Sequence, residues 1–423
     1  MKWDNIHKIL DDFTQHKHYQ LFFDKHNLPK KNSRLDMEKV LYDSVMDEGL
    51  VGPILPRDLF EDWLSLHQID GNNYSFVYNL EEKPKKELLQ NLFINRTNLI
   101  QRKVWEFDIE NYSENSSDNI LNLTDIYLVG IHRDDEYGKY IFSFVSPCEV
   151  TGTKLDGSNK VYKKLFFAHC VFQDDSNDLK IVFNPTSNLL NVNSVKKKSR
   201  FDWTPVANMF FVQMMSIIGT HRIIAPKWIP QALFLMAEEA TNHNNPEITE
   251  LSFNAQDKIA TFATDLLKDA SIDLEVESAL VQRLVQDIQQ SFEAQLVEKF
   301  GVNEDEESFS LFKQRSDGVN HTINVESRVE GIRGGSVAQA AKRSRIDGDL
   351  DLIGIIYRKA GRSYKFLVES ASDAYLVRGT NTFIEEEVVN DVIRKLNEYR
   401  NQIQSTAYHP DQCGKGTTVP SKE

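Results

Sequence analysis

The chain is poor in cysteine, has only modest glycine and proline, and contains no long uninterrupted apolar run. Its 423 residues include three cysteines, at positions 148, 170 and 413, with no Cys-x-x-Cys pair and no Cys/His set at zinc spacing. We therefore expect neither a disulfide framework nor a structural zinc, as suits a reducing cytosol. The longest apolar stretch, 206–219, contains interrupting polar residues and falls short of the roughly 20 residues that span a bilayer. We expect a buried core helix there.

The chain also lacks an excess of positive charge. With 49 basic and 63 acidic residues its net charge is -14, which argues against non-specific nucleic-acid binding by the whole surface. Any such binding needs a local basic patch. The N-terminus, MKWDNIHKILDDF, lacks the basic-then-apolar order of a signal peptide, so we expect a cytoplasmic protein without a membrane partner. No G-x-S-x-G, H-E-x-x-H or kinase signature is present.

The length and the changing hydrophobic pattern predict a multidomain α+β chain. Residues 1–80 are expected to form a helical module and residues 81–200 an antiparallel β domain, because short β-branched and aromatic runs alternate there with turn sequences. Residues 201–305 are expected to be helical. Residues 306–404 are expected to form a C-terminal antiparallel sheet, a β-meander, with a packed helix, and residues 405–423 a disordered tail.

Several helix boundaries can be predicted from capping residues. Ser33, with Asp36 three residues later, is a plausible N-cap, and Thr204-Pro205 has the order typical of a helix start. Gly301 is expected to end a helix over 275–300, and a helix over 383–403 carries an apolar stripe behind an acidic first turn. These two amphipathic helices are candidate interfaces with a protein partner.

The segment FFDKHNLPKKNSRLDMEKVL (22–41) resembles a SAP module, a two-helix DNA-binding motif. Residues 26–29 match the loop entry of that motif, while Asn32 takes the place of its glycine. The resemblance implies that Lys30, Lys31 and Arg34 contact phosphate at the start of the second helix. A plain helical hairpin is the alternative for a motif this short.

Two further basic clusters are candidate phosphate contacts in this acidic chain. One is KKKSR, with Lys196, Lys197, Lys198 and Arg200. The other is AAKRSR, with Lys342, Arg343 and Arg345. Solvated linkers are the alternative for both, because short basic runs are common in exposed segments.

Near the C-terminus, the run GDLDLIG followed by FLVES resembles the core of PD-(D/E)xK nucleases. That resemblance implies that Asp351 and Glu369 hold a divalent cation, Mg²⁺ or Mn²⁺, which activates the attacking water, with Asp349 auxiliary. Ala371 stands at the position of the signature lysine, and Lys365, on the same face as Glu369 by strand alternation, is the substitute. No other cofactor is expected.

The same stretch has a purely structural interpretation. LDLIGIIYR and YKFLVES flank a short turn that contains glycine, which predicts a β-hairpin whose acidic residues face solvent. Three functions stay open. The first is a non-catalytic binding or accessory protein that engages DNA or a nucleic-acid-processing partner. The second is a divergent metal-dependent nuclease, and the third a structural subunit of a larger assembly. Defence against foreign DNA would suit either of the first two.

Overall fold

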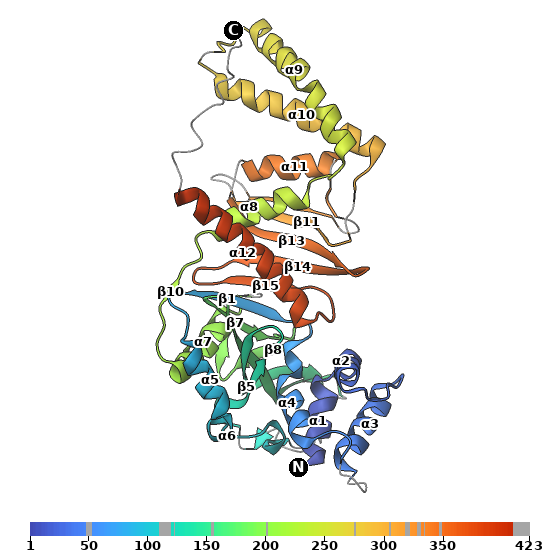
Figure 1. Ribbon diagram of the computed structural model, residues 1–423, viewed down its shortest axis with the longest axis vertical. Coiled ribbons are helices and arrows are strands. Elements are labelled where there is room, and N and C mark those ends of the chain that lie inside the picture. Colours follow the sequence, from blue (N-terminus) through green and yellow to red (C-terminus); the bar gives the residue numbers. More distant parts are fainter. Residues whose placement is uncertain are drawn as a thin grey trace, which may run out of the picture. The chain divides into compact units, whose positions relative to one another are not determined.

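The computed structural model describes residues 1–47, 53–109, 120–121, 123–153, 156–199, 202–274, 276–303, 306–317, 322–327, 331–333, 335–346 and 349–408. The predicted α+β class is confirmed, with a helical N-terminus, antiparallel strands, a helical middle and C-terminal strands followed by a helix (Figure 1). The chain divides into two compact units, residues 1–226 with 371–390 and residues 227–370 with 391–423. None of the described helices is both long and apolar enough to cross a bilayer.

The first unit begins with helices that surround one apolar core. Its helical elements are α1 (Trp3–Phe13), α2 (His16–His26), α3 (Arg34–Met46), α4 (Arg57–Leu66), η1 (His67–Ile69), α5 (Lys86–Ile94), α6 (Arg96–Leu99), η2 (Val104–Glu106) and α7 (Thr204–Ile218). Ser33 caps α3 by accepting a hydrogen bond from the Asp36 N–H, as predicted. Helix α7 is the buried helix expected over 206–219, and Thr204 begins it.

The sheet of the first unit is antiparallel and has the order β15-β1-β7-β6-β5-β8-β9, with β10 beside β1 and β4 beside β5. Its strands are β1 (Tyr74–Leu80), β4 (Tyr127–Asp134), β5 (Lys139–Thr153), β6 (Asn159–Gln173), β7 (Asp178–Phe183), β8 (Leu189–Val192), β9 (Val195–Lys196), β10 (Ile223–Ile224) and β15 (Tyr375–Gly379). A separate pair joins β2 (Asp108–Ile109) to β3 (Ile120–Leu121). Strand β1 lies between β7 and β15, so part of the segment expected to be a helical module belongs to the sheet.

Two apolar cores cover the two faces of this sheet. Because side chains alternate along a strand, Phe166 and Cys170 of β6 face helices α5 and α7, where Phe210 is fully buried. Phe167 of β6 faces the opposite side, toward the core of α1 to α4 that includes Phe60. The sheet is therefore covered on both faces, which explains its near-continuous apolar strands.

The second unit has a four-stranded antiparallel arrangement in the order β12-β11-β13-β14. Its elements are α8 (Ile229–Ala240), α9 (Pro246–Asp269), α10 (Ser278–Phe300), β11 (Ser308–Asp317), β12 (Thr322–Glu326), α11 (Gly335–Ile346), β13 (Asp349–Lys359), β14 (Arg362–Ser370) and most of α12 (Glu386–Tyr408). Helix α8 lies against β11 and β13, and the Tyr399 hydroxyl of α12 donates to Glu239 of α8 at 2.5 Å. Residues 409–423, most of the expected tail, lie outside the described residues.

The two predicted amphipathic helices differ in burial. Val392 and Leu396 of α12 are fully buried, as its apolar stripe predicts. Leu284, Ile288 and Phe292 of α10 stay half-buried, although α10 packs against α9 and α11. Among the described residues of α10 only Ala294 is buried. The role of α10 as a partner interface remains a prediction.

Candidate functional site

The acidic hairpin near the C-terminus forms as predicted. Strands β13 and β14 pair from Leu352–Glu369 to Lys359–Arg362 around a two-residue turn. Ala360 (φ 49°) and Gly361 (φ 72°) both have left-handed backbones, the conformation that a tight hairpin turn with the right-handed twist of its strands requires. The Asp351 and Glu369 carboxylates converge, since Arg315 of β11 contacts both, at 2.6 Å and 3.1 Å.

A β-bulge brings these side chains together. The β11–β13 register shifts between the pairs Arg315–Leu352 and Ser316–Leu350, so Asp351 has no partner across the ladder and its side chain is re-aimed. Arg315 then donates from Nε to both Asp351 oxygens, at 2.9 and 2.8 Å. The hydrogen bond to Asp351 raises the pKa of Arg315, against partial burial. The guanidinium stays charged and offsets one of the two negative charges.

The other proposed nuclease residues lie apart from this ion pair. The Lys365 ammonium lies 5.5 Å from the centroid of the Phe312 ring, and Asp349 is exposed at the start of β13. No group of three or more His, Cys, Asp or Glu side chains in the described part of the chain could hold a metal ion. The two carboxylates therefore contact a guanidinium of the same unit, that of Arg315. A salt bridge on the surface of the sheet accounts for this arrangement.

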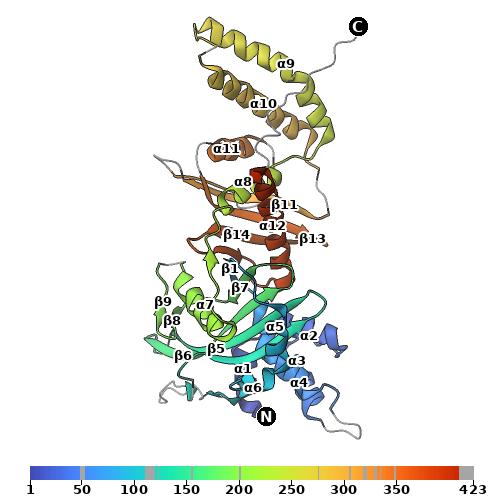
Figure 2. The same ribbon diagram turned by 60° about the vertical axis from the view of Figure 1, so that its left-hand side comes forward.

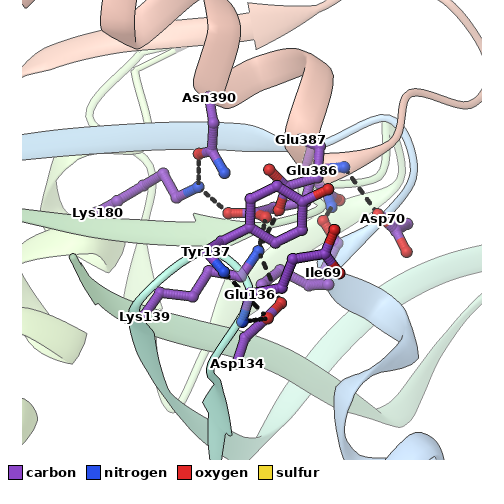
Figure 3. Close-up of polar contacts among 11 residues, drawn as sticks. Ile69, Asp70, Asp134, Glu136, Tyr137, Lys139, Lys180, Glu386, Glu387 and Asn390 are labelled. Atoms are coloured by element: carbon purple, nitrogen blue, oxygen red, sulfur yellow. Dashed lines mark hydrogen bonds and ion pairs between the residues drawn. The ribbon is translucent and has the colours of Figure 1, made fainter. Parts of the chain in front are cut away.

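A buried ionic cluster in the first unit was not anticipated from the sequence. Lys139 of β5 donates to Glu386 at 2.7 Å and also to Glu387, both in the first turn of α12 (Figure 3). Lys180 of β7 donates to Glu386 and, at 2.5 Å, to Asn390. The side chains of Lys139, Lys180 and Glu386 are only 5–6% exposed. Ion pairs between almost fully buried side chains thus join β5 and β7 to the start of α12.

The charges of this cluster are mutually dependent. Burial alone would raise the pKa of Glu386, but the Lys180 and Lys139 ammonium groups hold it below its ordinary value, so Glu386 stays ionised. Asp70 accepts the Glu386 backbone N–H at 2.7 Å, and burial raises the pKa of Asp70 to about 7. Because Glu386, Lys139 and Lys180 each contact a group of opposite charge, the cluster fixes the start of α12.

The same sheet face carries buried pairs of hydroxyl and imidazole groups. Ser143 Oγ lies 3.0 Å from His169 Nδ1, and Ser65 Oγ lies 3.0 Å from His132 Nε2. Burial lowers the pKa of His169 to about 3 and that of His132 to about 4, so both imidazoles are neutral. Ser143 and His169 are fully buried, and His169 Nε2 has no hydrogen-bond partner among the described residues. These pairs are packed core groups.

A cleft of about 470 Å³ lies between the N-terminal helices and the edge of the sheet in the first unit. Its apolar lining comes mainly from Phe13, Val150, Leu165, Phe166, Phe167 and Leu189. Its polar lining includes Asp11, Asp12, Arg34, Gln68, Asp70 and Asn188. Such a volume, with apolar walls and a few polar groups, is typical of a ligand or side-chain binding site.

Two ion pairs line this cleft. Arg34 donates to the Asp11 carbonyl oxygen at 2.8 Å and contacts the Asp11 carboxylate, and the Lys164 ammonium lies 3.0 Å from Asp12. Asp11 and Asp12 lie near the C-terminal end of α1, where the helix dipole disfavours negative charge and no basic residue of the last turn compensates. Arg34, expected to contact phosphate, thus neutralises the end of α1.

The other candidate phosphate contacts of the first unit do not form a single patch among the described residues. Lys30 pairs with Asp24, and Lys31 is exposed between α2 and α3. Lys196 and Lys198 are exposed near β9, on the other side of this unit from α2 and α3 (Figure 2). The Lys197 ammonium lies 5.4 Å from the Trp203 ring centroid, and Arg200 lies outside the described residues.

In the second unit, the expected linker AAKRSR is part of helix α11. The Arg345 side chain is fully buried and donates to Glu238, Gln314 and Thr241, so it is not available to phosphate, contrary to the expectation. Burial lowers the pKa of Arg345, against the attraction of Glu238. Arg343 pairs with Asp287 at 2.8 Å and stays half-exposed, and Lys342 is half-buried.

One feature of the sequence could have indicated the buried ionic cluster, namely a charged residue within an apolar strand. Lys180 interrupts DLKIVF, a strand in which every residue is buried. A lysine at such a position needs a buried acid, and the three consecutive glutamates at 385–387 were the available source.

Comparisons of the chain with protein-family models, with curated proteins and with solved structures find no match.

Proposed function

We propose that this chain is a non-catalytic binding protein that engages its partner through the first unit. One observation carries the proposal. The candidate catalytic carboxylates, Asp351 and Glu369, are bridged by Arg315, whereas the first unit offers a cleft of about 470 Å³ with apolar walls. Binding needs a shaped and partly apolar surface, while metal-dependent hydrolysis needs carboxylates open to a cation.

A cleavage assay tests the absence of nuclease chemistry. We expect no Mg²⁺- or Mn²⁺-dependent hydrolysis of plasmid or single-stranded DNA by the full chain. Asp351→Ala and Glu369→Ala should each lower the free energy of unfolding by less than about 1 kcal/mol, because these carboxylates are 39% exposed and solvent screens the pair. Metal-dependent cleavage that both substitutions abolish in a folded protein would overturn the proposal.

DNA is the second candidate partner, and one observation favours it. Lys30 and Lys31 directly precede the capped N-terminus of α3, where the helix dipole favours an anion. Asp36 in the first turn and the Asp24 partner of Lys30 oppose such binding. The expected affinity is therefore low and falls steeply with salt.

A mobility-shift series separates the basic clusters. Lys30→Glu/Lys31→Glu should abolish any shift of duplex DNA at low salt, because the change removes two positive charges before α3 and adds two negative ones. Lys196→Glu/Lys198→Glu, a double change of equal charge on the other side of the same unit, is the control and should leave the shift unchanged. Equal loss in both variants, or a shift that neither changes, would exclude the α2–α3 segment as the DNA contact.

A further inference from the structure

Helices α9 and α10 form an antiparallel hairpin in the second unit. Ser252 of α9 donates to Glu293 of α10 at 2.5 Å and accepts from Gln289 at 3.1 Å, which marks the line along which the two helices meet. Helix α11 lies against another side of α10 (Figure 1), where the Gln339 amide donates to Ser291 at 2.6 Å. Two sides of α10 are thus occupied by neighbouring helices.

A third side of α10 is apolar and only half-covered. At 100° per residue, the buried Ala294 lies in the arc between the contacts with α9 and α11. The opposite arc carries Leu284 and Ile288, which are half-buried, and one turn before them Leu280 is 39% exposed. This arc therefore presents apolar side chains on the side away from α11.

Helix α9 carries a matching apolar stripe. Phe262 and Leu266 are 55% and 45% exposed and lie beside the buried line of Ile259 and Ala263. Leu251, eleven residues before Phe262, continues the stripe three turns earlier. Both stripes are displaced from the α9–α10 contact line in the same rotational sense, and since the helices are antiparallel, they lie on the same side of the hairpin.

We call this side the hairpin face. It consists of Leu251, Phe262 and Leu266 of α9 with Leu280, Leu284 and Ile288 of α10. Single exposed apolar residues are normal on a protein surface, whereas a contiguous apolar patch marks a site of interaction.

The size of the hairpin face matches a protein–protein interface. Helix α9 has 24 residues and α10 has 23. Helices of this length are about 35 Å long, and two of them side by side are about 20 Å wide. The face thus offers about 700 Å² per copy, near the roughly 800 Å² that each partner buries in a standard interface.

The charges beside the apolar stripe of α9 complement themselves. Lys258 lies one turn before Phe262, and Asp265 lies one turn after it on the same side of the helix. Both are exposed, and neither forms an ion pair with another described residue. A two-fold axis near Phe262 that sets two α9 helices antiparallel places each Lys258 opposite Asp265 of the other copy.

We infer that the chain forms a dimer in which the hairpin face packs against the hairpin face of a second copy, across a two-fold axis near Phe262. The four helices bury the apolar stripes, and two pairs of Lys258 with Asp265 flank the centre. A second copy fits the face because the charges on either side of Phe262 are opposite in sign and equally spaced. The dimer goes beyond the proposed binding function and does not use the cleft of the first unit.

Sedimentation velocity of the full chain between about 1 and 100 µM tests the dimer. We expect the mass to approach twice that of one chain at the upper end. Phe262→Ser should weaken the dimer at least about tenfold, because Phe262 lies at its centre. Phe253→Ser is the matched control on the same helix, since Phe253 is 73% exposed, lies about 180° around the helix from Phe262 and should leave the dimer unchanged.

A charge reversal distinguishes a second copy from an unrelated partner. Lys258→Asp should weaken the dimer about tenfold, because it sets two acids opposite each other at both ends of the contact. Lys258→Asp/Asp265→Lys should restore the affinity of the unaltered chain, since the reversed charges complement each other only in a self-pairing. Both positions are exposed, so the variants keep the fold.

Three results would overturn the inference. The first is a chain that stays monomeric over the whole range, which would leave the hairpin face to a different protein or to another part of the same chain. The second is a dimer that Phe262→Ser leaves unchanged. The third is a double reversal that binds as weakly as Lys258→Asp alone.

Discussion

Replacing Glu386 by glutamine is expected to lower the free energy of unfolding of the first unit by about 3 kcal/mol. Glutamine keeps the shape of the side chain but removes the charge that both Lys139 and Lys180 contact. The Lys139 and Lys180 side chains are 5% and 6% exposed, so neither gains hydration in exchange for the lost carboxylate. Lys139 keeps its contact with Glu387, whereas among the described residues Lys180 is left with the neutral Asn390. Breaking a buried pair on one side is costly because an uncompensated charge remains in the interior.

Urea unfolding followed by tryptophan fluorescence measures this change. Four of the five tryptophans, at positions 3, 63, 105 and 203, belong to the first unit, so the signal reports mainly on it. Asp24→Asn is a matched control in the same unit, since Asp24 is 60% exposed in its pair with Lys30 and should change stability by less than about 0.5 kcal/mol. A loss below about 1 kcal/mol for Glu386→Gln would contradict the structural role of the cluster.

Replacing Arg345 by methionine is expected to destabilise the second unit by about 3 kcal/mol. The guanidinium, fully buried between α8 and β11, donates to the Gln314 amide oxygen at 2.9 Å and to the Thr241 hydroxyl at 3.1 Å. Methionine fills much of the volume, but it leaves Gln314 and Glu238 without their donor. The acceptor of the fully buried Gln314 accounts for most of the expected loss, since Glu238 is 39% exposed and can be hydrated.

The neighbouring residue provides the control for Arg345. Arg343→Met on the same helix removes an ion pair with Asp287 whose arginine is 52% exposed, so its effect should stay within about 0.5 kcal/mol. Native-state hydrogen exchange of the β11 and β13 amides measures the stability of the second unit in both variants. Equal exchange in the two variants would show that burial of Arg345 carries no stability.

The sequence predicted those features that depend on neighbouring residues. The β13–β14 hairpin follows from its alternating strands and from a turn whose second residue is glycine, and the start of α3 follows from Ser33 and Asp36. Helix α7 follows from an apolar run flanked by Thr204-Pro205. In each case the residues that determine the structure lie within a few positions of one another.

The features that were missed depend on residues far apart in the chain. Lys139 meets Glu386 across 247 positions, and no local pattern links them. Strand β11 escaped prediction because its inward positions carry Ser310, Gln314 and Ser316, which reverses the usual order of apolar inside and polar outside. Those polar groups are satisfied by α11, where Ser344 and the Ala341 carbonyl accept hydrogen bonds from Gln314.

The site around Asp351 and Glu369 likewise combines a local feature that the sequence predicted with a distant one that it did not. Whether Asp351 and Glu369 converge was the question that the acidic hairpin raised, and both carboxylates contact the same guanidinium, that of Arg315. Arg315 comes from β11, outside the hairpin motif, so the motif alone could not reveal it.

The cleavage assay with the full chain tests the central claim most directly. If the chain is a binding protein whose Asp351 and Glu369 carboxylates are bridged by Arg315, DNA should stay intact in Mg²⁺ and in Mn²⁺. Metal-dependent cleavage that Asp351→Ala and Glu369→Ala each abolish in a folded chain would contradict this account.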